Sequence, residues 1–182
     1  MKATGIVRRI DDLGRVVIPK EIRRTLRLRE GTPLEIFTDR EGEIILKKYS
    51  PMAELGSFAR QYAESLAQTT GCVVCITDRD SVIAVAGGMK KDYIGKPISK
   101  QLETLILNRD TAALSKSDKD FITVMTGDTD EYQYQVIYPI ISEGDAIGSV
   151  AILTKDTKGK MGDTEQKLAY TAAAFLGRQM ES

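Results

Sequence analysis

Residues 8–26 contain the pattern from which the rest of the fold can be worked out: RRIDDLGRVVIPKEIRRTL. Two short runs rich in β-branched residues, 4–10 and 13–18, flank the pair Asp11-Asp12. Runs of this length separated by aspartates are typical of a strand, a turn and a second strand. We therefore expect the chain to begin with two strands joined by a turn.

A short helix and a hairpin are expected to follow. Pro19 suits the first turn of a helix, and Ile22 and Leu26 are four residues apart, which places them on one helix face. The runs 34–37 and 43–46 flank a turn-forming segment and predict a β-hairpin. The N-terminal unit should therefore have the order β-β-α-β-β.

This unit, residues 1–50, is too small to be comfortably stable alone. Domains of this size bury only about 60% of the surface of the unfolded chain, and they usually depend on a metal, a disulfide or association. The unit has no cysteine and no histidine. We therefore expect it to form a two-fold dimer, which would bring two copies of its basic segment together.

Charge is distributed unevenly along the chain. The formal net charge of the 182 residues is zero, but residues 1–29 carry nine basic and three acidic side chains, a net of +6, and the rest carries −6. Seven of the nine basic residues are arginine, whose planar guanidinium binds phosphates and base edges bidentately. A solvated charged surface is the ordinary explanation of such a run, and the steepness of the asymmetry makes nucleic-acid binding an equal alternative.

Several classes of site are excluded or disfavoured. The chain has no histidine, which removes imidazole general bases, Ser-His and Cys-His dyads, and His-containing zinc sites. Cys72 and Cys75 have C-x-x-C spacing, but they lie in a predicted strand that would point them to opposite faces, so we interpret them as structural thiols. No phosphate-loop pattern occurs. We expect no enzyme activity, no cofactor and no metal.

Ser50-Pro51 predicts a new helix, with Ser50 as N-cap, that runs over residues 51–70 and stops at Gly71. A final helix is expected to open at Asp163 as N-cap, with Gln166 completing a capping box. A further helix should follow Ser99, and strands are predicted at 72–77, 82–86, 121–126, 132–141 and 146–154. The predicted fold class is α+β, with an antiparallel sheet flanked by helices over residues 71–182.

No apolar run approaches the ~20 residues that span a bilayer. The first residues, MKATGIVRRI, lack the apolar core of a signal peptide. We therefore expect a cytoplasmic protein.

The core Gly14-Arg-Val-Val-Ile-Pro19, followed by Glu21-Ile-Arg-Arg24, closely resembles the swapped-hairpin DNA-binding domain of AbrB-type transition-state regulators. That resemblance implies that residues 1–50 of two interleaved chains present one basic surface to double-stranded DNA. The residues that match the family's DNA-contact positions are Arg8, Arg9, Arg15, Arg23 and Arg24. Arg9 stands where the family often has lysine.

Beyond that domain, the segments KKYSPMAELG (47–56) and FLGRQM (175–180) resemble the stage V sporulation protein T family of spore-forming bacteria. The resemblance implies a GAF domain in the second half and a role as activator or repressor of late, forespore sporulation genes. The sequence lacks the Asn-Lys-x-Asp motif of cyclic-nucleotide GAF domains, so a small-molecule ligand is possible but unidentified. Apolar faces on the helices at 51–70 and 164–181 predict that the GAF halves also self-associate, giving a homotetramer.

Two other functions remain as alternatives. Related swapped-hairpin domains also occur in antitoxins, which bind DNA and regulate their own toxin–antitoxin pair. An antitoxin would carry a disordered toxin-wrapping tail, whereas this chain continues with well-patterned globular sequence. A small redox enzyme that uses Cys72 and Cys75 is disfavoured by their predicted place in a strand.

Overall fold

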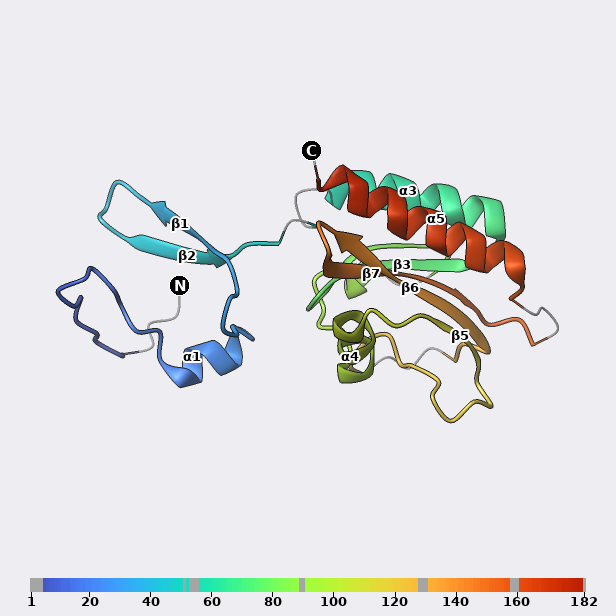
Figure 1. Cartoon of the computed structure of the whole chain (residues 1–182), viewed down its shortest axis with the longest axis horizontal. Helices are drawn as coiled ribbons and strands as arrows, with labels where there is room; N and C mark the ends of the chain where they lie inside the picture. Colours follow the sequence, from blue (N-terminus) through green and yellow to red (C-terminus); the bar gives the residue numbers. More distant parts are fainter. Residues whose placement is uncertain are drawn as a thin grey trace. The chain divides into compact units, whose positions relative to one another are not determined.

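The computed structural model describes residues 5–50, 52, 56–88, 91–127, 131–157 and 161–181. The chain divides into two compact units, residues 1–49 and 50–182 (Figure 1). Across the described residues, no helix combines the length and the apolar character that a membrane span needs.

The first unit contains one short helix and one hairpin. Helix α1 spans Lys20–Thr25, and strands β1 (Leu34–Thr38) and β2 (Ile44–Lys48) pair antiparallel with Leu34 opposite Lys48. The helix and hairpin predicted from the sequence are therefore confirmed.

The two strands predicted at 4–10 and 13–18 are not formed in the single chain, where β1 and β2 are the only strands of residues 5–50. The segment turns back on itself, and the described backbone hydrogen bonds within it are confined to its turn, where Asp11 N donates to Arg15 O (3.0 Å) and Gly14 N donates to Asp11 O (3.0 Å). A strand needs a neighbour that exchanges backbone hydrogen bonds with it along its length. The extended residues on either side of this turn have no such neighbour among the described residues of one chain.

The first unit has almost no core of its own. Of its described residues, Pro19 alone is buried. Eleven of its large hydrophobic side chains are exposed, and the following are more than 60% exposed: Val7, Ile10, Leu13, Val17, Ile36 and Ile44. An apolar cavity of about 510 Å³ lies between the N-terminal segment, α1 and the hairpin, with Val16, Leu26 and Leu46 in its wall. Contiguous exposed apolar surface marks an interaction site.

The second unit is built on a five-stranded antiparallel sheet of order β4-β3-β7-β6-β5. Its strands are β3 (Val73–Asp78), β4 (Val82–Ala86), β5 (Ala112–Ser115), β6 (Tyr134–Ser142) and β7 (Asp145–Thr154). Its helices are α3 (Gly56–Thr70), the 3₁₀ turn η1 (Lys91–Tyr93), α4 (Lys100–Asn108) and α5 (Asp163–Gln179). Helices α3 and α5 lie side by side on one face of the sheet and α4 covers the other (Figure 1). The predicted α+β class is confirmed.

The strand predicted at 121–126 is wrong, and the sheet edge is formed by β5, a strand that was not predicted from the sequence. Segment 121–126 carries apolar side chains into the core without pairing along its length with a strand; a single bridge joins Met125 to Ile98. The buried carboxamide of Gln135 donates to Ile122 O (2.8 Å) and accepts from Ile122 N (2.7 Å). A side chain therefore takes the place of a neighbouring strand, so an apolar run that resembles a strand folds as an irregular crossing segment.

One helix starts at a different residue from the one predicted, and the start of another lies outside the described residues. The N-cap of α5 is Gly162 rather than Asp163, because Glu165 reaches back and accepts a hydrogen bond from Gly162 N (2.7 Å). Pro51, where the connecting helix was predicted to begin, lies outside the described residues. The described part of that helix, α3, ends at Thr70, and Gly71 follows with φ +68° as predicted.

The two cysteines lie on opposite sides of the sheet. Cys75 is fully buried in the cluster beneath α4, and Cys72 is partly buried against the cluster beneath α3 and α5. Burial raises the pKa of the Cys72 thiol, which keeps it in its unreactive neutral form. The predicted placement of the two thiols on opposite faces of the sheet is confirmed, and their purely structural role stays a prediction.

The close approach of α5 to the sheet at Gly177 provides a test of this packing. Gly177 of α5 lies against the backbone of Ile141, and a methyl group added at Gly177 would collide with the Ile141 carbonyl oxygen. Helix propensity alone would make Gly177→Ala stabilising by about 1 kcal/mol. We expect the opposite, a loss of about 1–3 kcal/mol of unfolding free energy in urea titrations, because the collision is with backbone. The control is Gly56→Ala in α3, which has open space and should not destabilise the fold.

Candidate nucleic-acid interface

All five arginines predicted to contact DNA are exposed in the folded chain: Arg8, Arg9, Arg15, Arg23 and Arg24. The first three lie on the N-terminal segment on either side of its turn, and the last two are neighbours in the last turn of α1. Exposure leaves guanidinium donors accessible to a polyanion. Arg8 is also one of the residues that line the apolar cavity.

Local sequence explains why α1 presents its arginines outward. The helix follows the buried Pro19, whose carbonyl accepts a hydrogen bond from Arg23 N (2.9 Å). The half-buried Ile22 faces inward, which leaves the positions after it exposed. The helix ends because Arg27 adopts a left-handed conformation (φ 53°) and Leu28 N returns to Arg23 O (2.7 Å). Basic side chains in a last turn also complement the negative end of the helix dipole.

Arg15 is positioned by a neighbouring carboxylate. The Oδ1 atom of Asp11 accepts hydrogen bonds from Leu13 N (3.0 Å) and Arg15 N (2.7 Å), and its Oδ2 atom accepts from Arg15 Nε (2.8 Å). Hydrogen bonds from the Arg15 backbone and side chain lower the pKa of Asp11, so the carboxylate stays charged near neutral pH. The Arg15 side chain is still 68% exposed. From the sequence, Asp11 was expected only as a turn residue, and its contact with Arg15 was not predicted.

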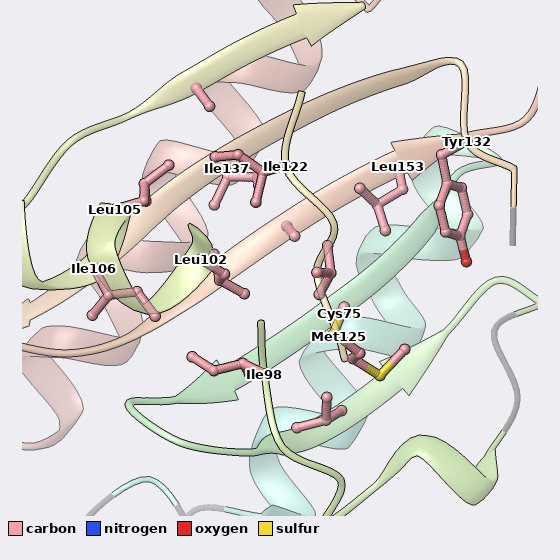
Figure 2. Close-up of a cluster of buried hydrophobic side chains, with 14 of the residues drawn as sticks. Cys75, Ile98, Leu102, Leu105, Ile106, Ile122, Met125, Tyr132, Ile137 and Leu153 are labelled. Carbon is pink, nitrogen blue, oxygen red and sulfur yellow. The ribbon is translucent and has the colours of Figure 1, made fainter. Parts of the chain in front are cut away.

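The second unit offers a packed interior on the face beneath α4. Figure 2 shows side chains from α4, from the sheet and from segment 121–126 gathered there, with Leu102, Met125 and Ile137 among them. Each of these three is at most 1% exposed. Nowhere in the described part of the chain do three or more Cys, Asp or Glu side chains gather in a way that could hold a metal ion.

Comparison with protein families divides the chain in the same region as the structure. The family described as "Stage V sporulation protein T C-terminal, transcription factor" matches residues 54–181. The family described as "Antidote-toxin recognition MazE, bacterial antitoxin" matches residues 7–54. The antitoxin alternative is not favoured, because most of the chain matches the transcription-factor family instead.

Two proteins of Bacillus subtilis (strain 168) are similar in sequence. Stage V sporulation protein T is 55% identical over 181 residues, covering 100% of this chain and 99% of that protein. The transition state regulatory protein AbrB is 65% identical over 51 residues, covering 28% of this chain and 52% of that protein.

The fold of the second unit also has a solved counterpart. The GAF domain from an Acinetobacter phosphoenolpyruvate-protein phosphotransferase superposes with a TM-score of 0.59 at 13% identity, over 74% of this chain and 84% of that one. This likeness identifies the fold as GAF-like and carries no activity with it. The chain is 55% identical to one relative over its full length, and residues 54–181 match the family model. The chain therefore belongs to the stage V sporulation protein T family of transcription factors, which are not enzymes.

Proposed function

We propose that this transcription factor binds double-stranded DNA through a dimer of residues 1–50 and regulates late sporulation genes in the forespore cytoplasm, as activator or repressor according to promoter. Residues 51–70 would connect this domain to a GAF-like domain at 71–182. The observation that carries the proposal is the set of five exposed arginines on a unit whose apolar side chains are left uncovered.

The uncovered apolar side chains support dimerisation of the first unit. Residues such as Val7, Val17 and Ile36 are at least 69% exposed in one chain. Burial of apolar surface contributes about 25 cal/mol per Å². A second copy that packs against the cavity would therefore give the dimer much of the stability that the unit lacks alone. A second copy also offers the extended segment 5–18 the strand neighbours that it lacks within one chain. This is the swapped-hairpin arrangement, and its two-fold symmetry doubles the number of arginines on one surface.

The DNA contact assigned to the arginines can be tested through salt dependence. If about six of the contacts in a dimer are to phosphates, the logarithm of the association constant should fall with the logarithm of salt concentration at a slope near −5. Arg23→Ala removes one cation from each protomer, so the slope should flatten by about 2, and Arg15→Ala should also weaken binding without unfolding the protein. Fluorescence anisotropy over a salt series measures both. Arg60→Ala, an exposed arginine of α3, is the control and should leave the slope unchanged. Folded Arg15 and Arg23 variants that bind as well as the original chain would contradict the assignment.

Assembly beyond the dimer is proposed through α3 and α5. On these helices the rings of Phe58, Tyr62 and Phe175 form a cluster with centroids 5.5–6.3 Å apart. Tyr62 is stacked on both phenylalanines, which are tilted relative to each other. Phe175 remains 38% exposed and Tyr170, on the same helix, 61% exposed. Aromatic residues that lie partly uncovered on a helical layer are characteristic of the centre of an interface. Two different dimer interfaces in one chain give a tetramer.

The proposed tetramer can be separated into dimers by one substitution. We expect the full chain to sediment as a tetramer at micromolar concentration and Phe175→Asp to sediment as a dimer that still binds DNA, because a charge placed in an apolar interface is costly to desolvate. Leu107→Asp is the matched control, since Leu107 is 52% exposed on α4 at the opposite face of the sheet. A monomer for the original chain, or a tetramer for Phe175→Asp, would contradict the proposal.

The first residues of the second unit, Ser50 and Met52, are held against the GAF-like fold by a hydrogen bond and by burial. This contact matters for how that domain could control DNA binding. Ser50 Oγ donates to Asp78 Oδ2 (2.7 Å), and Asp78 Oδ1 accepts from the backbone of Asp80 (2.7 Å) and Ser81 (2.6 Å) in the β3–β4 turn. Met52 is fully buried in the cluster beneath α3 and α5. We propose that this anchorage makes the joint stiff, so that the GAF-like domain, with or without a small-molecule ligand, sets the spacing of two DNA-binding dimers.

Stiffness of the joint predicts a dependence on the helical phase of DNA. Affinity for a duplex with two sites should oscillate as their separation changes, with the period of about 10.5 bp of one DNA turn. A flexible Gly-Ser segment inserted between Tyr49 and Ser50 should flatten the oscillation while retaining avidity, because flexible linkers keep the effective concentration high. Gel shifts over a spacing series give both results. An original chain that is insensitive to phase would rule out the stiff joint.

A further inference from the structure

Two turns of the first unit have the same construction. In each, an aspartate Oδ1 accepts the backbone N–H groups two and four residues later, at 3.0 and 2.7 Å for Asp11 and at 3.0 and 2.8 Å for Asp39. In each, the backbone N–H of that aspartate donates to the carbonyl four residues later, at 3.0 and 3.2 Å. Glycine occupies the fourth position of both, with φ +74° at Gly14 and +83° at Gly42. Through its Oδ1 atom and its backbone N–H, Asp39 therefore makes the same contacts as Asp11; the bond from Gly14 N to Asp11 O (3.0 Å) is described for the first turn alone.

Asp11 makes one contact that the turn does not need. Its Oδ2 atom accepts a hydrogen bond from Arg15 Nε at 2.8 Å. The position that corresponds to Arg15 in the second turn is occupied by Glu43, which offers no cation. Both aspartates therefore form a turn, but among the described contacts only at the first turn does the aspartate also bind an arginine side chain. Comparing the two positions distinguishes these roles.

Holding Nε leaves the functional end of the arginine available. A guanidinium has five N–H donors, and the Nε contact occupies one, so the two Nη groups with four donors extend beyond it. An unrestrained arginine loses much of its rotamer freedom when it binds. A guanidinium that is already oriented by a carboxylate loses less, so its contact is both stronger and more selective in geometry.

The carboxylate also affects which DNA group suits Arg15. A phosphate bound to this guanidinium would lie close to the charged Asp11, and like charges repel. A guanine edge is neutral and presents two acceptors, O6 and N7, that match the two Nη groups. An exposed carboxylate at a DNA-binding surface repels the phosphates of every DNA sequence and so lowers nonspecific affinity. Its presence beside Arg15 therefore favours a contact with a base edge, which distinguishes one sequence from another.

We propose that Asp11 is a positioning residue that orients Arg15 for a bidentate contact with a guanine base edge, and thereby determines sequence specificity. The inference rests on the proposed DNA-binding function. It distinguishes Arg15 from the other candidate arginines, whose exposed side chains suit phosphate contacts.

The test compares a specific with a nonspecific duplex. The probes are the duplex of highest affinity selected in vitro by the full-length protein and a scrambled duplex of the same composition. Asp11→Asn keeps a side-chain oxygen for the two backbone N–H groups but removes the charge, and its amide nitrogen cannot accept from Arg15 Nε. We expect the ratio of the two affinities to fall about tenfold, while affinity for the scrambled duplex stays equal or rises. Asp11→Ser, a shorter uncharged acceptor, should behave in the same way and serves if the asparagine variant folds poorly.

Asp39→Asn is the matched control, because it makes the same change of charge in the same kind of turn without an arginine. It should leave the specificity ratio unchanged. A second control repeats Asp11→Asn in an Arg15→Lys background, where the ratio should not fall further because no guanidinium remains to be oriented.

The outcomes that overturn the inference are distinct from those that overturn the proposed function. If Asp11→Asn strengthens binding to both duplexes equally, Asp11 acts only as a repulsive charge and the positioning role is wrong. An equal fall in the ratio with and without the Arg15 guanidinium would overturn it as well. If Arg15→Ala and Arg23→Ala both leave binding unchanged, the DNA-binding assignment itself fails. Weakened binding in Arg15→Ala with an unchanged ratio in Asp11→Asn rejects the positioning role alone.

Discussion

Apolar side chains in a unit of about fifty residues have to be buried against something, and in the first unit of this protein one chain supplies too little. Val7, Val17 and Ile36 are at least 69% exposed in one chain, and Pro19 is the one buried residue among those described there. The proposed dimer follows from this constraint. The five candidate arginines are exposed in one chain, and Arg8 also lines the apolar cavity that a second copy would fill.

The turn at Asp11 shows how one residue can serve both the fold and the site. Its carboxylate closes the turn through two backbone N–H groups and reaches Arg15 through its second oxygen. The comparable turn at Asp39 has the first property without the second. In the proposed positioning role, fold and recognition would be coupled at an exposed position, where a carboxylate would otherwise be expected only to weaken attraction to a polyanion.

The second unit meets the burial constraint in the opposite way. Both faces of its sheet are covered, one by α3 and α5 and the other by α4 with segment 121–126, and the two resulting cores contain side chains such as Ile76 and Leu102 that have no exposed surface. Such an interior is rigid and transmits displacement rather than absorbing it. Because Met52 lies in one of these cores and Ser50 is bonded to Asp78, the chain leaves this rigid body at a defined point.

Much of this structure was already present in the local sequence. Pro19 with the Ile22 and Leu26 spacing specified α1, and the segment around Asp39 specified the β1–β2 hairpin, because turn geometry and helix periodicity depend on neighbours a few residues away. The candidate arginines were identified from charge density and family resemblance. Their exposure could be expected from the sequence, because charged side chains usually remain at the surface whatever the rest of the fold is.

What the sequence could not provide were the features that depend on distant partners. The runs at 4–10 and 13–18 have strand composition, yet a strand exists only where another strand is beside it, and the described residues of one chain do not offer one. Segment 121–126 also resembles a strand, but Gln135 binds the backbone of Ile122 in place of a neighbouring strand. The contact between Asp11 and Arg15 required the folded turn, because sequence separation alone does not say which carboxylate oxygen a guanidinium will meet.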